Sequence, residues 1–299
     1  MSSAEREFLH ELPEFEVYTP STLRDTLTYL SAEGRGAKLL AGGTSLIPRM
    51  RKKGISVKRV VDLSGLTGLQ YVRLTGKTIR IGGLTTVSEL AASDVFDERY
   101  DCIRALGRLF GSEATRNMAT VAGNLAAGEE GDLVQILCAL GGKVVVKSAK
   151  RERLAEPTKM GLGEDEVIVE VQIPALGGSV STSFGKFEKR KGGGKGIVTT
   201  AILVRLGKDR MIEDVRIVVS GAQGKKAGRA RKAESRLKGR VADAGTIQSA
   251  LDTLGSEIEP TGDFRASSRF RKEVTRVMVK DGLLQCLDRL RDGSGAYRG

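Results

Sequence analysis

The sequence predicts an α+β fold, and three observations support this prediction. Expected strands and helices are mixed without a regular alternation, which disfavours a doubly wound parallel sheet. Residues 71–82 alternate apolar and polar side chains around a Gly76-Lys77 turn, a pattern typical of a β-hairpin. From about residue 226 onward, the chain consists of three segments with helical periodicity. With 299 residues and a hydrophobic content of 40%, the chain is long enough and apolar enough to bury a substantial core.

The N-terminal half is expected to be a mixture of short elements. Residues 21–33 place leucines at helical spacing between a Ser/Thr cap and Gly34. Pro48 falls in the first turn of a second short helix, where a missing N–H costs little. The other elements expected before residue 175 are strands at 37–42, 59–64, 143–148 and 166–174 and helices at 45–54, 85–94, 102–110 and 132–140.

The C-terminal half is expected to be a sheet followed by helices. The turn-rich residues 175–179 are the best candidate for a domain boundary. Three apolar segments beyond it predict antiparallel strands, at 179–191, 197–206 and 211–222. Helices are expected after these strands, at 226–239, 243–255 and 269–290.

The composition excludes several kinds of chemistry. The only histidine, His10, is expected to be a solvated surface residue, so catalytic sites and metal centres built on histidine are excluded. The three dispersed cysteines form no C-x-x-C pair, which argues against an iron–sulfur loop and favours a reducing, cytoplasmic compartment. The charged N-terminus is not a signal peptide, and no apolar run reaches the roughly 18 residues of a membrane helix. A bound cofactor is therefore expected to supply any chemistry.

The formal charge of the chain is concentrated in one segment. The whole chain carries +12, and residues 185–240 alone hold 17 basic and 5 acidic residues, which also gives +12. Such a segment can attract nucleic acid or dock a partner protein. Phe187 is its only aromatic residue, which makes base stacking and a nucleic-acid partner the less favoured interpretation.

Two glycine-containing segments are candidates for binding a diphosphate. The first is Ala41-Gly42-Gly43-Thr44-Ser45, between an expected strand and the start of a helix, where backbone N–H groups can face an anion. The second runs from Arg116 to Asn124. Taken singly, both strings are also compatible with ordinary turns and helix caps. The chain contains neither a G-x-G-x-x-G nor a Walker A string, so a Rossmann or P-loop site is not predicted.

Taken in order, the segments LLAGGTSLIPRM and, about 75 residues later, RNMATVAGNLAAG resemble the FAD-binding subunit of molybdenum hydroxylases. This is the medium subunit of the carbon monoxide dehydrogenase and xanthine dehydrogenase family, with a PCMH-type FAD domain. The blocks VVDLSGLTGL, IRIGGLTTVSEL, EDEVIVEVQIP, FGKFEKRK and EPTGDFRASSRFRKEV are also similar to that family. The resemblance covers roughly residues 14–290 and therefore a complete subunit.

The resemblance implies two domains. Residues 1–176 would form the FAD-binding domain, with lobes at about 1–64 and 65–176 and FAD between them. Residues 177–299 would form the C-terminal flavoprotein domain, a three-stranded antiparallel sheet packed on helices.

The resemblance also implies a set of cofactor-binding residues, with no catalytic or metal-binding residue in this chain. Two loops would bracket the FAD diphosphate, and an acidic, an apolar and a basic residue would lie near the flavin ring. FAD would be bound non-covalently, because the single histidine lies outside both loops. The implied residues are Ala41, Gly42, Gly43, Thr44, Ser45, Leu46, Thr120, Gly123, Asn124, Asp132, Ile168 and Lys186.

The sequence departs from the family pattern at three places. Ala122 stands where a glycine is usual, and Glu129-Glu130 occupies a shortened connection before Asp132. After Arg190, the stretch GGGKG replaces an acidic and aromatic sequence. These departures bear on the position of Asp132 and on access to the flavin.

The implied function is electron transfer. Electrons from the [2Fe–2S] clusters of a small partner subunit would pass through FAD to an external acceptor, while a large partner would bind the molybdenum cofactor. The assembly would be a cytoplasmic dimer of heterotrimers without a membrane span. Two alternatives are a self-contained FAD oxidoreductase with the same type of FAD domain and, less favoured, a basic nucleic-acid-binding protein.

Overall fold

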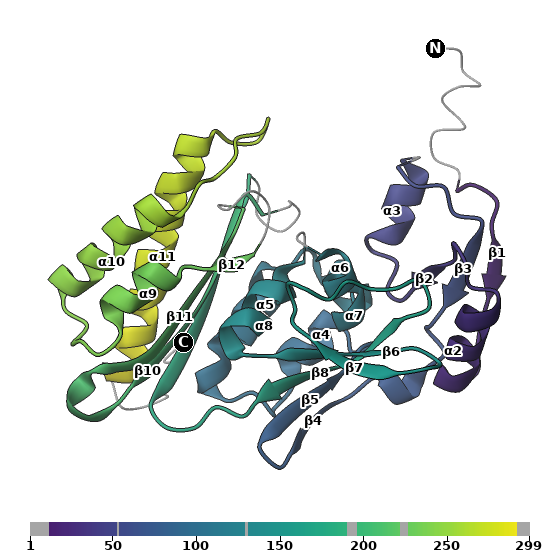
Figure 1. Cartoon of the computed structure of the whole chain (residues 1–299), viewed down its shortest axis with the longest axis horizontal. Coiled ribbons are helices and arrows are strands. Elements are labelled where there is room, and N and C mark those ends of the chain that lie inside the picture. Colours follow the sequence, from purple (N-terminus) through teal and green to yellow (C-terminus); the bar gives the residue numbers. More distant parts are fainter. Residues whose placement is uncertain (1–11, 53, 129–130, 190–195, 222–226, 292–299) are drawn as a thin grey trace.

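The computed structural model describes residues 12–52, 54–128, 131–189, 196–221 and 227–291. It consists of a small N-terminal lobe, a middle lobe built on a larger sheet, and a C-terminal sheet covered by long helices (Figure 1). This arrangement confirms the predicted α+β class. His10, the Glu129-Glu130 pair and four of the five residues of GGGKG lie outside the described residues.

The N-terminal lobe is a three-stranded parallel sheet with two helices. Its strand order is β1-β3-β2, and β3 is the central strand. Val61 of β3 is fully buried and packs with Leu27 and Leu30 of the first helix. The strand β1 was not expected, because it has only three residues and little apolar pattern. The elements are β1 (Glu16–Tyr18), α2 (Leu23–Ala32), β2 (Lys38–Leu40), α3 (Leu46–Arg51), β3 (Arg59–Asp62) and the 3₁₀ turn η1 (Thr67–Leu69).

The middle lobe contains a five-stranded sheet whose neighbouring strands are all antiparallel. The order is β4-β5-β8-β6-β7, with the long strand β8 at the centre. The predicted hairpin is confirmed, and Gly76 adopts the positive φ of 59° that its turn requires. The edge strand β7 was not expected. The strands are β4 (Val72–Thr75), β5 (Thr78–Gly82), β6 (Lys143–Lys147), β7 (Glu152–Ala155) and β8 (Val167–Pro174).

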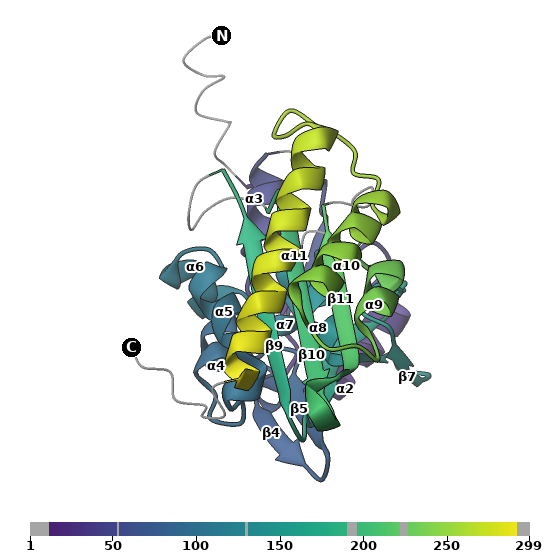
Figure 2. The ribbon, with the colours of Figure 1, turned by 90° about the vertical axis from the view of Figure 1, so that its left-hand side faces the viewer.

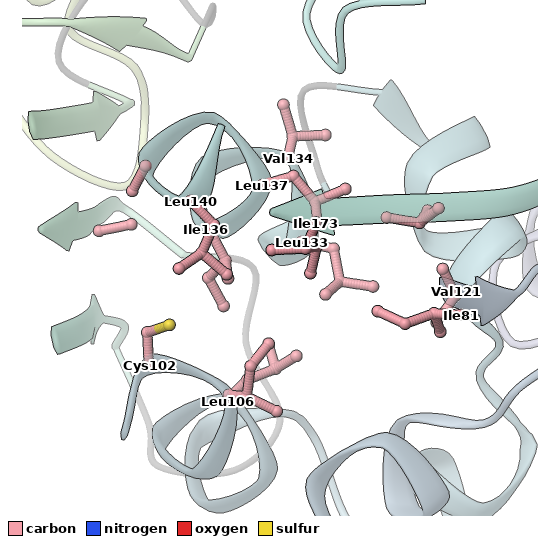
Figure 3. Packing of buried hydrophobic residues seen from close by; sticks show 14 of the residues in the cluster. Ile81, Cys102, Leu106, Val121, Leu133, Val134, Ile136, Leu137, Leu140 and Ile173 are labelled. Carbon is pink, nitrogen blue, oxygen red and sulfur yellow. The ribbon is translucent and has the colours of Figure 1, made fainter. Parts of the chain in front are cut away.

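Helices cover this sheet and complete the main core. Leu106 of α5 and Leu133, Ile136 and Leu140 of α8 are almost completely buried, and all four belong to the cluster shown in Figure 3. Two short helices, α6 and α7, correct the expectation that residues 116–124 form a loop. The elements are α4 (Val87–Ala92), the 3₁₀ turn η2 (Glu98–Tyr100), α5 (Asp101–Leu109), α6 (Glu113–Met118), α7 (Val121–Ala126) and α8 (Asp132–Leu140).

The C-terminal part has three long antiparallel strands, as predicted, followed by helices. A two-residue strand, β12, pairs with the edge of β11 inside a segment that was expected to be wholly helical. The guanidinium of Arg229 in this strand binds Glu234, which also accepts from the backbone of Ile217. The elements are β9 (Val180–Phe187), β10 (Val198–Leu206), η4 (Lys208–Arg210), β11 (Ile212–Ser220), β12 (Gly228–Arg229), α9 (Arg231–Leu237), α10 (Ala244–Glu257) and α11 (Ser268–Arg291).

The C-terminal sheet is buried on both faces. Along β10, Ala201 and Leu203 join the middle-lobe core, while Ile202 and Val204 pack with the helices that follow the sheet. Polar contacts join the same two parts: Arg289 forms an ion pair of 2.9 Å with Asp101. The C-terminal sheet is therefore fixed against α5 and α8. None of the helices in the described part of the chain is long and apolar enough to cross a membrane.

Candidate functional site

The fold brings the two glycine-containing segments into direct contact. A Cβ atom added to Gly42 would lie 1.7 Å from the carbonyl oxygen of Met118 and 3.2 Å from the Cα of Ala119. No side chain fits in that space, so glycine is required for the first segment to reach the second. The structure thus joins segments that are some 75 residues apart in the sequence.

The first segment leaves a backbone donor open. It turns from β2 into α3 through Gly43, whose φ of 69° is in the left-handed region. Ser45 is the N-cap of α3, but its side chain makes no capping hydrogen bond. In the first turn of α3, the N–H of Ile47 donates to the carbonyl of Gly43 at 3.0 Å and Pro48 has no N–H, which leaves the N–H of Leu46 as the open donor of this turn in the described part of the chain. Thr44 is exposed and Ser45 half-buried, and the first turn of α3 holds no acidic residue.

The second segment, in contrast, has its backbone groups engaged. The buried Thr120 caps α7 by accepting from the N–H of Gly123 at 3.1 Å. The N–H of Val121 donates to Thr85, and that of Ala122 donates to Gly83. Ala122, which stands where the family usually has glycine, is 8% exposed and packs in the main core, so its extra methyl group is accommodated.

Asn124 connects this segment to α8. Its Oδ1 accepts from the N–H of Leu133 at 2.9 Å, which satisfies a donor in the first turn of α8. A Cβ on Gly131 would lie 2.2 Å from the carbonyl oxygen of Asn124, so glycine is required there too. These contacts fix the N-terminal end of α8 and with it Asp132.

Asp132 and Lys186 form a buried ion pair across the two parts of the molecule. Lys186 Nζ on β9 lies 2.9 Å from Asp132 Oδ2, and the two side chains are only 7% and 9% exposed. Burial raises the pKa of the Asp132 carboxyl, while the Lys186 charge opposes that rise. Glu188 Oε2 is 3.8 Å from the same ammonium group. Two residues predicted separately therefore form one electrostatic unit, in which the lysine charge is partly balanced.

Ile168 lies deeper than the other predicted residues. Its side chain is 5% exposed and belongs to the main core. Its carbonyl oxygen would be 2.5 Å from a Cβ on Gly83, so the chain passes closely over β8 at this point. The structure shows a core residue here, and contact of Ile168 with a flavin ring stays a prediction.

The structure adds one residue that sequence reasoning missed. The half-buried ring of Phe110 lies 5.9 Å from Lys186 Nζ, at the end of α5. A pocket of about 290 Å³ opens beside Lys186, and its lining includes Leu109 from the middle lobe and Asp281 and Gln285 from α11. No signal in the sequence connects Phe110 with Lys186, because only the packing of α5 against β9 brings them together.

The basic segment of residues 185–240 divides into paired and exposed side chains. Lys186, Arg216 and Arg229 form ion pairs with carboxylates. The basic residues of α9 and the following turn are exposed, namely Arg231, Lys232, Arg236, Lys238 and Arg240. Five others, Arg190, Lys191, Lys195, Lys225 and Lys226, lie outside the described residues.

Comparison with known families identifies both parts of the chain. Residues 13–176 match the FAD binding domain in molybdopterin dehydrogenase. Residues 184–286 match the C-terminal domain of the carbon monoxide dehydrogenase flavoprotein. In the described residues, no group of three or more His, Cys, Asp or Glu side chains could hold a metal ion.

Similar proteins agree with these matches along nearly their whole length. The glyceraldehyde dehydrogenase medium chain of Sulfolobus acidocaldarius is 26% identical over 89% of this chain and 96% of its own. The nicotine 6-hydroxylase medium subunit of Paenarthrobacter nicotinovorans is 28% identical over 92% and 98%.

Solved structures establish the fold independently. Carbon monoxide dehydrogenase from Hydrogenophaga pseudoflava, in a form that lacks the Mo-pyranopterin moiety, superposes with a TM-score of 0.86 at 24% identity, covering 93% of this chain and 99% of that one. Quinoline 2-oxidoreductase from Pseudomonas putida 86 gives 0.86 at 21% identity, covering 94% and 99%.

The fold and the matched domains define the class first: this is an FAD-dependent oxidoreductase subunit, with FAD as its cofactor. The chain belongs to the family of FAD-binding medium subunits of molybdenum hydroxylases, which includes the carbon monoxide and xanthine dehydrogenases.

Proposed function

We propose that this chain is the electron-transfer subunit of a cytoplasmic, multi-subunit molybdenum hydroxylase. Electrons enter from the [2Fe–2S] clusters of a small partner subunit and leave through FAD to an external acceptor. A large partner binds the molybdenum cofactor, and the assembly is a dimer of heterotrimers. The observation that carries this proposal is the contact of Gly42 with Met118, which joins the two glycine-containing segments. The second segment is in turn hydrogen-bonded, through Asn124, to the helix that carries Asp132 of the buried Asp132–Lys186 pair.

The first segment is proposed to hold the FAD diphosphate. The open N–H of Leu46 at the start of α3 is a donor of the kind that binds phosphate, and the positive φ of Gly43 lets the backbone approach a ligand without a side chain between them. Thr44 and Ser45 supply further hydroxyl donors. These residues fit FAD, which when bound non-covalently supplies the redox chemistry that the side chains of this chain lack.

The second segment and its neighbours are proposed to position the flavin ring. Thr120, Gly123 and Asn124 are held in place, because the Thr120–Gly123 hydrogen bond caps α7 and Asn124 ties α7 to α8. The Lys186 ammonium stabilises negative charge on the reduced ring, and Asp132 holds that ammonium in place while reducing its net effect. Ile168 is proposed to contribute apolar surface.

Both alternatives have less support. A self-contained FAD oxidoreductase does not account for the match of residues 184–286 to the carbon monoxide dehydrogenase flavoprotein domain. Nucleic-acid binding is disfavoured because Phe187 is the only aromatic residue of the charged segment, which leaves little for base stacking. We also propose a domain division at residues 176 and 177, which falls just before β9.

Purification of the chain with its partner subunits tests this function. We expect a yellow complex with one FAD per copy of this chain and with molybdenum and iron in the other subunits. A folded chain that purifies without flavin and does not bind added FAD would refute the proposal. A flavin-containing chain that is active alone with an organic substrate would favour the self-contained enzyme.

A further inference from the structure

A shallow groove of about 450 Å³ runs along the outer side of the middle lobe, between α4, α5 and α6. Figure 2 shows these three helices together at one edge of the molecule. Gly107 allows the close approach of α4 and α5, because a Cβ there would lie 2.6 Å from that of Ala91. The lining residues are Ser88, Ala91, Ala92, Arg104, Gly107, Arg108, Glu113, Arg116 and Asn117.

Two of the three arginines in this groove are held in place by backbone carbonyl groups. Arg104 Nη2 donates to the carbonyl of Phe96 at 3.0 Å. Arg116 Nη1 donates to the carbonyls of Phe110 and Gly111. Such bonds orient a guanidinium group without neutralising its charge, so less side-chain freedom is lost when a ligand binds.

The charge of these arginines is only partly compensated. Arg104 acts on Asp97, whose pKa is lowered mainly by its hydrogen bond with Arg99 and in part by the Arg104 charge. In the part of the chain that the structure describes, neither Arg104 nor Arg116 forms an ion pair with a carboxylate. Arg108, which is 57% exposed, lies 3.6 Å from Asp101, but that carboxylate binds Arg289 more closely, at 2.9 Å. Glu113 is the one acidic residue in the lining, against three arginines.

We infer that this groove docks an acidic segment of a partner subunit, with aspartate or glutamate carboxylates bound by Arg104, Arg108 and Arg116. Guanidinium groups bind carboxylates through paired hydrogen bonds, and arginine clusters are a common means of recognising acidic motifs. The lining contains no aromatic ring on which a nucleotide base could stack, and its floor of alanine and glycine admits a polypeptide.

The position of the groove indicates which partner docks there, an inference that rests on the proposed function. Ser88 Oγ donates to Asn117 Oδ1 within the groove. Asn117 directly precedes Met118, whose carbonyl group contacts Gly42 of the first cofactor segment. The groove lining on α6 therefore ends one residue before the contact between the two glycine-containing segments. The structure assigns the groove to the cluster-carrying subunit that delivers electrons to the flavin.

The test compares two double variants with the same change in charge. R104E/R108E reverses two groove charges, while R24E/R35E reverses two exposed charges in and just after α2, in the N-terminal lobe and outside the basic segment of residues 185–240. Neither pair includes a proposed FAD ligand. The measurement is the association rate of each FAD-loaded variant with the purified cluster-carrying subunit at about 0.05 and 0.5 M salt. A labelled ten-residue glutamate peptide serves as a second probe.

We expect R104E/R108E to slow association by about tenfold or more at low salt, because interfacial charges steer encounter, and by much less at high salt, where they are screened. R24E/R35E should change the rate less than twofold. The glutamate peptide should lose its affinity only for the groove variant. If R104E/R108E does not fold, R104Q/R108Q should give the same order of effects with smaller magnitude.

Equal effects of the two double variants, or no effect of either, would overturn the docking assignment. So would a groove variant that loses binding of a single-stranded oligonucleotide but keeps its subunit association rate. The flavin content of the wild-type chain separates this result from failure of the proposed function. A chain that lacks FAD refutes the proposed function whatever the groove binds. An FAD-loaded chain whose association rate is unchanged by the groove variants refutes only the docking site.

Discussion

The two glycine-containing segments have opposite local structures. Residues 41–46 form a turn into α3 whose N-cap, Ser45, makes no side-chain capping bond. Residues 119–124 form a capped helix start whose N–H groups donate to Thr120, Thr85 and Gly83. The comparison shows that the backbone N–H groups of a glycine-containing segment can either stay available to a ligand or form hydrogen bonds within the protein. On this account, the first segment is the diphosphate cradle and the second is its supporting wall.

The largest effect is expected from Gly42→Val, which attacks the contact between the segments. The added Cβ would overlap the carbonyl oxygen of Met118, whose present distance from that position is 1.7 Å. We expect a loss of about 3 kcal/mol or more in the free energy of unfolding, at the upper end for overpacking, together with loss of FAD. Urea unfolding measures the first and the flavin-to-protein ratio the second.

Gly68→Ala is the matched control for this variant. No atom lies within 4 Å of the position that its Cβ would take. It should change the free energy of unfolding by less than about 0.5 kcal/mol. If Gly42→Val were no more harmful than Gly68→Ala, the segments would not be packed as described.

The next largest effect is expected from Gly43→Glu, which acts on the ligand and less on the fold. A carboxylate would stand beside the diphosphate, and a residue other than glycine would be strained at a φ of 69°. We expect a folded protein that retains no FAD after gel filtration. Gly43→Ala carries the backbone strain without the charge and should keep part of its flavin. Full flavin content in Gly43→Glu would contradict the proposal that this segment binds the FAD diphosphate.

A smaller effect is expected from Thr120→Val, which keeps the shape of the side chain but removes the helix cap. The hydroxyl of Thr120 accepts from Gly123, and loss of such a cap costs about 1 kcal/mol. Thr120→Ser retains the acceptor and should restore most of this free energy of unfolding. Equal stability of the serine and valine variants would contradict the structural role of the cap.

The smallest effect concerns the buried ion pair and appears in the redox potential. Lys186→Ala should lower the two-electron potential of the bound flavin, because a cation near the reduced ring is lost. A change of about 1.4 kcal/mol corresponds to about 30 mV for a two-electron couple. Asp132→Asn should shift the potential in the opposite direction, because the charge of Lys186 is then balanced only by the more distant Glu188. Redox titration of both variants measures these potentials, and shifts of the same sign would contradict the opposed roles of Lys186 and Asp132.

Much of the fold could be predicted because its elements carry local signals. The three long C-terminal strands alternate or are uniformly apolar, and α8 combines an apolar run with the C-cap glycine Gly141. The elements that were missed lack such signals. The strands β1 and β12 have three and two residues and form only through pairing with β3 and β11.

The candidate site was predictable as a set of residues but not as an arrangement. The resemblance named Asp132 and Lys186, yet nothing local showed that α8 and β9 would bring them within 2.9 Å of each other. Phe110 was missed because its proximity to Lys186 is purely tertiary. The helices α6 and α7 were missed because each has only six residues and their glycine and polar residues indicated a loop.

Comparison of FAD with riboflavin, which lacks the diphosphate, tests the central claim most directly. Isothermal titration of the flavin-free protein should show that the wild type prefers FAD by about a hundredfold or more, since each 1.4 kcal/mol is a factor of ten. Gly43→Ala should lose most of that preference while its affinity for riboflavin stays unchanged. Thr120→Val should weaken both ligands to a similar extent. An undiminished preference for FAD in Gly43→Ala, or a selective loss of FAD in Thr120→Val, would contradict the assignment of the two segments.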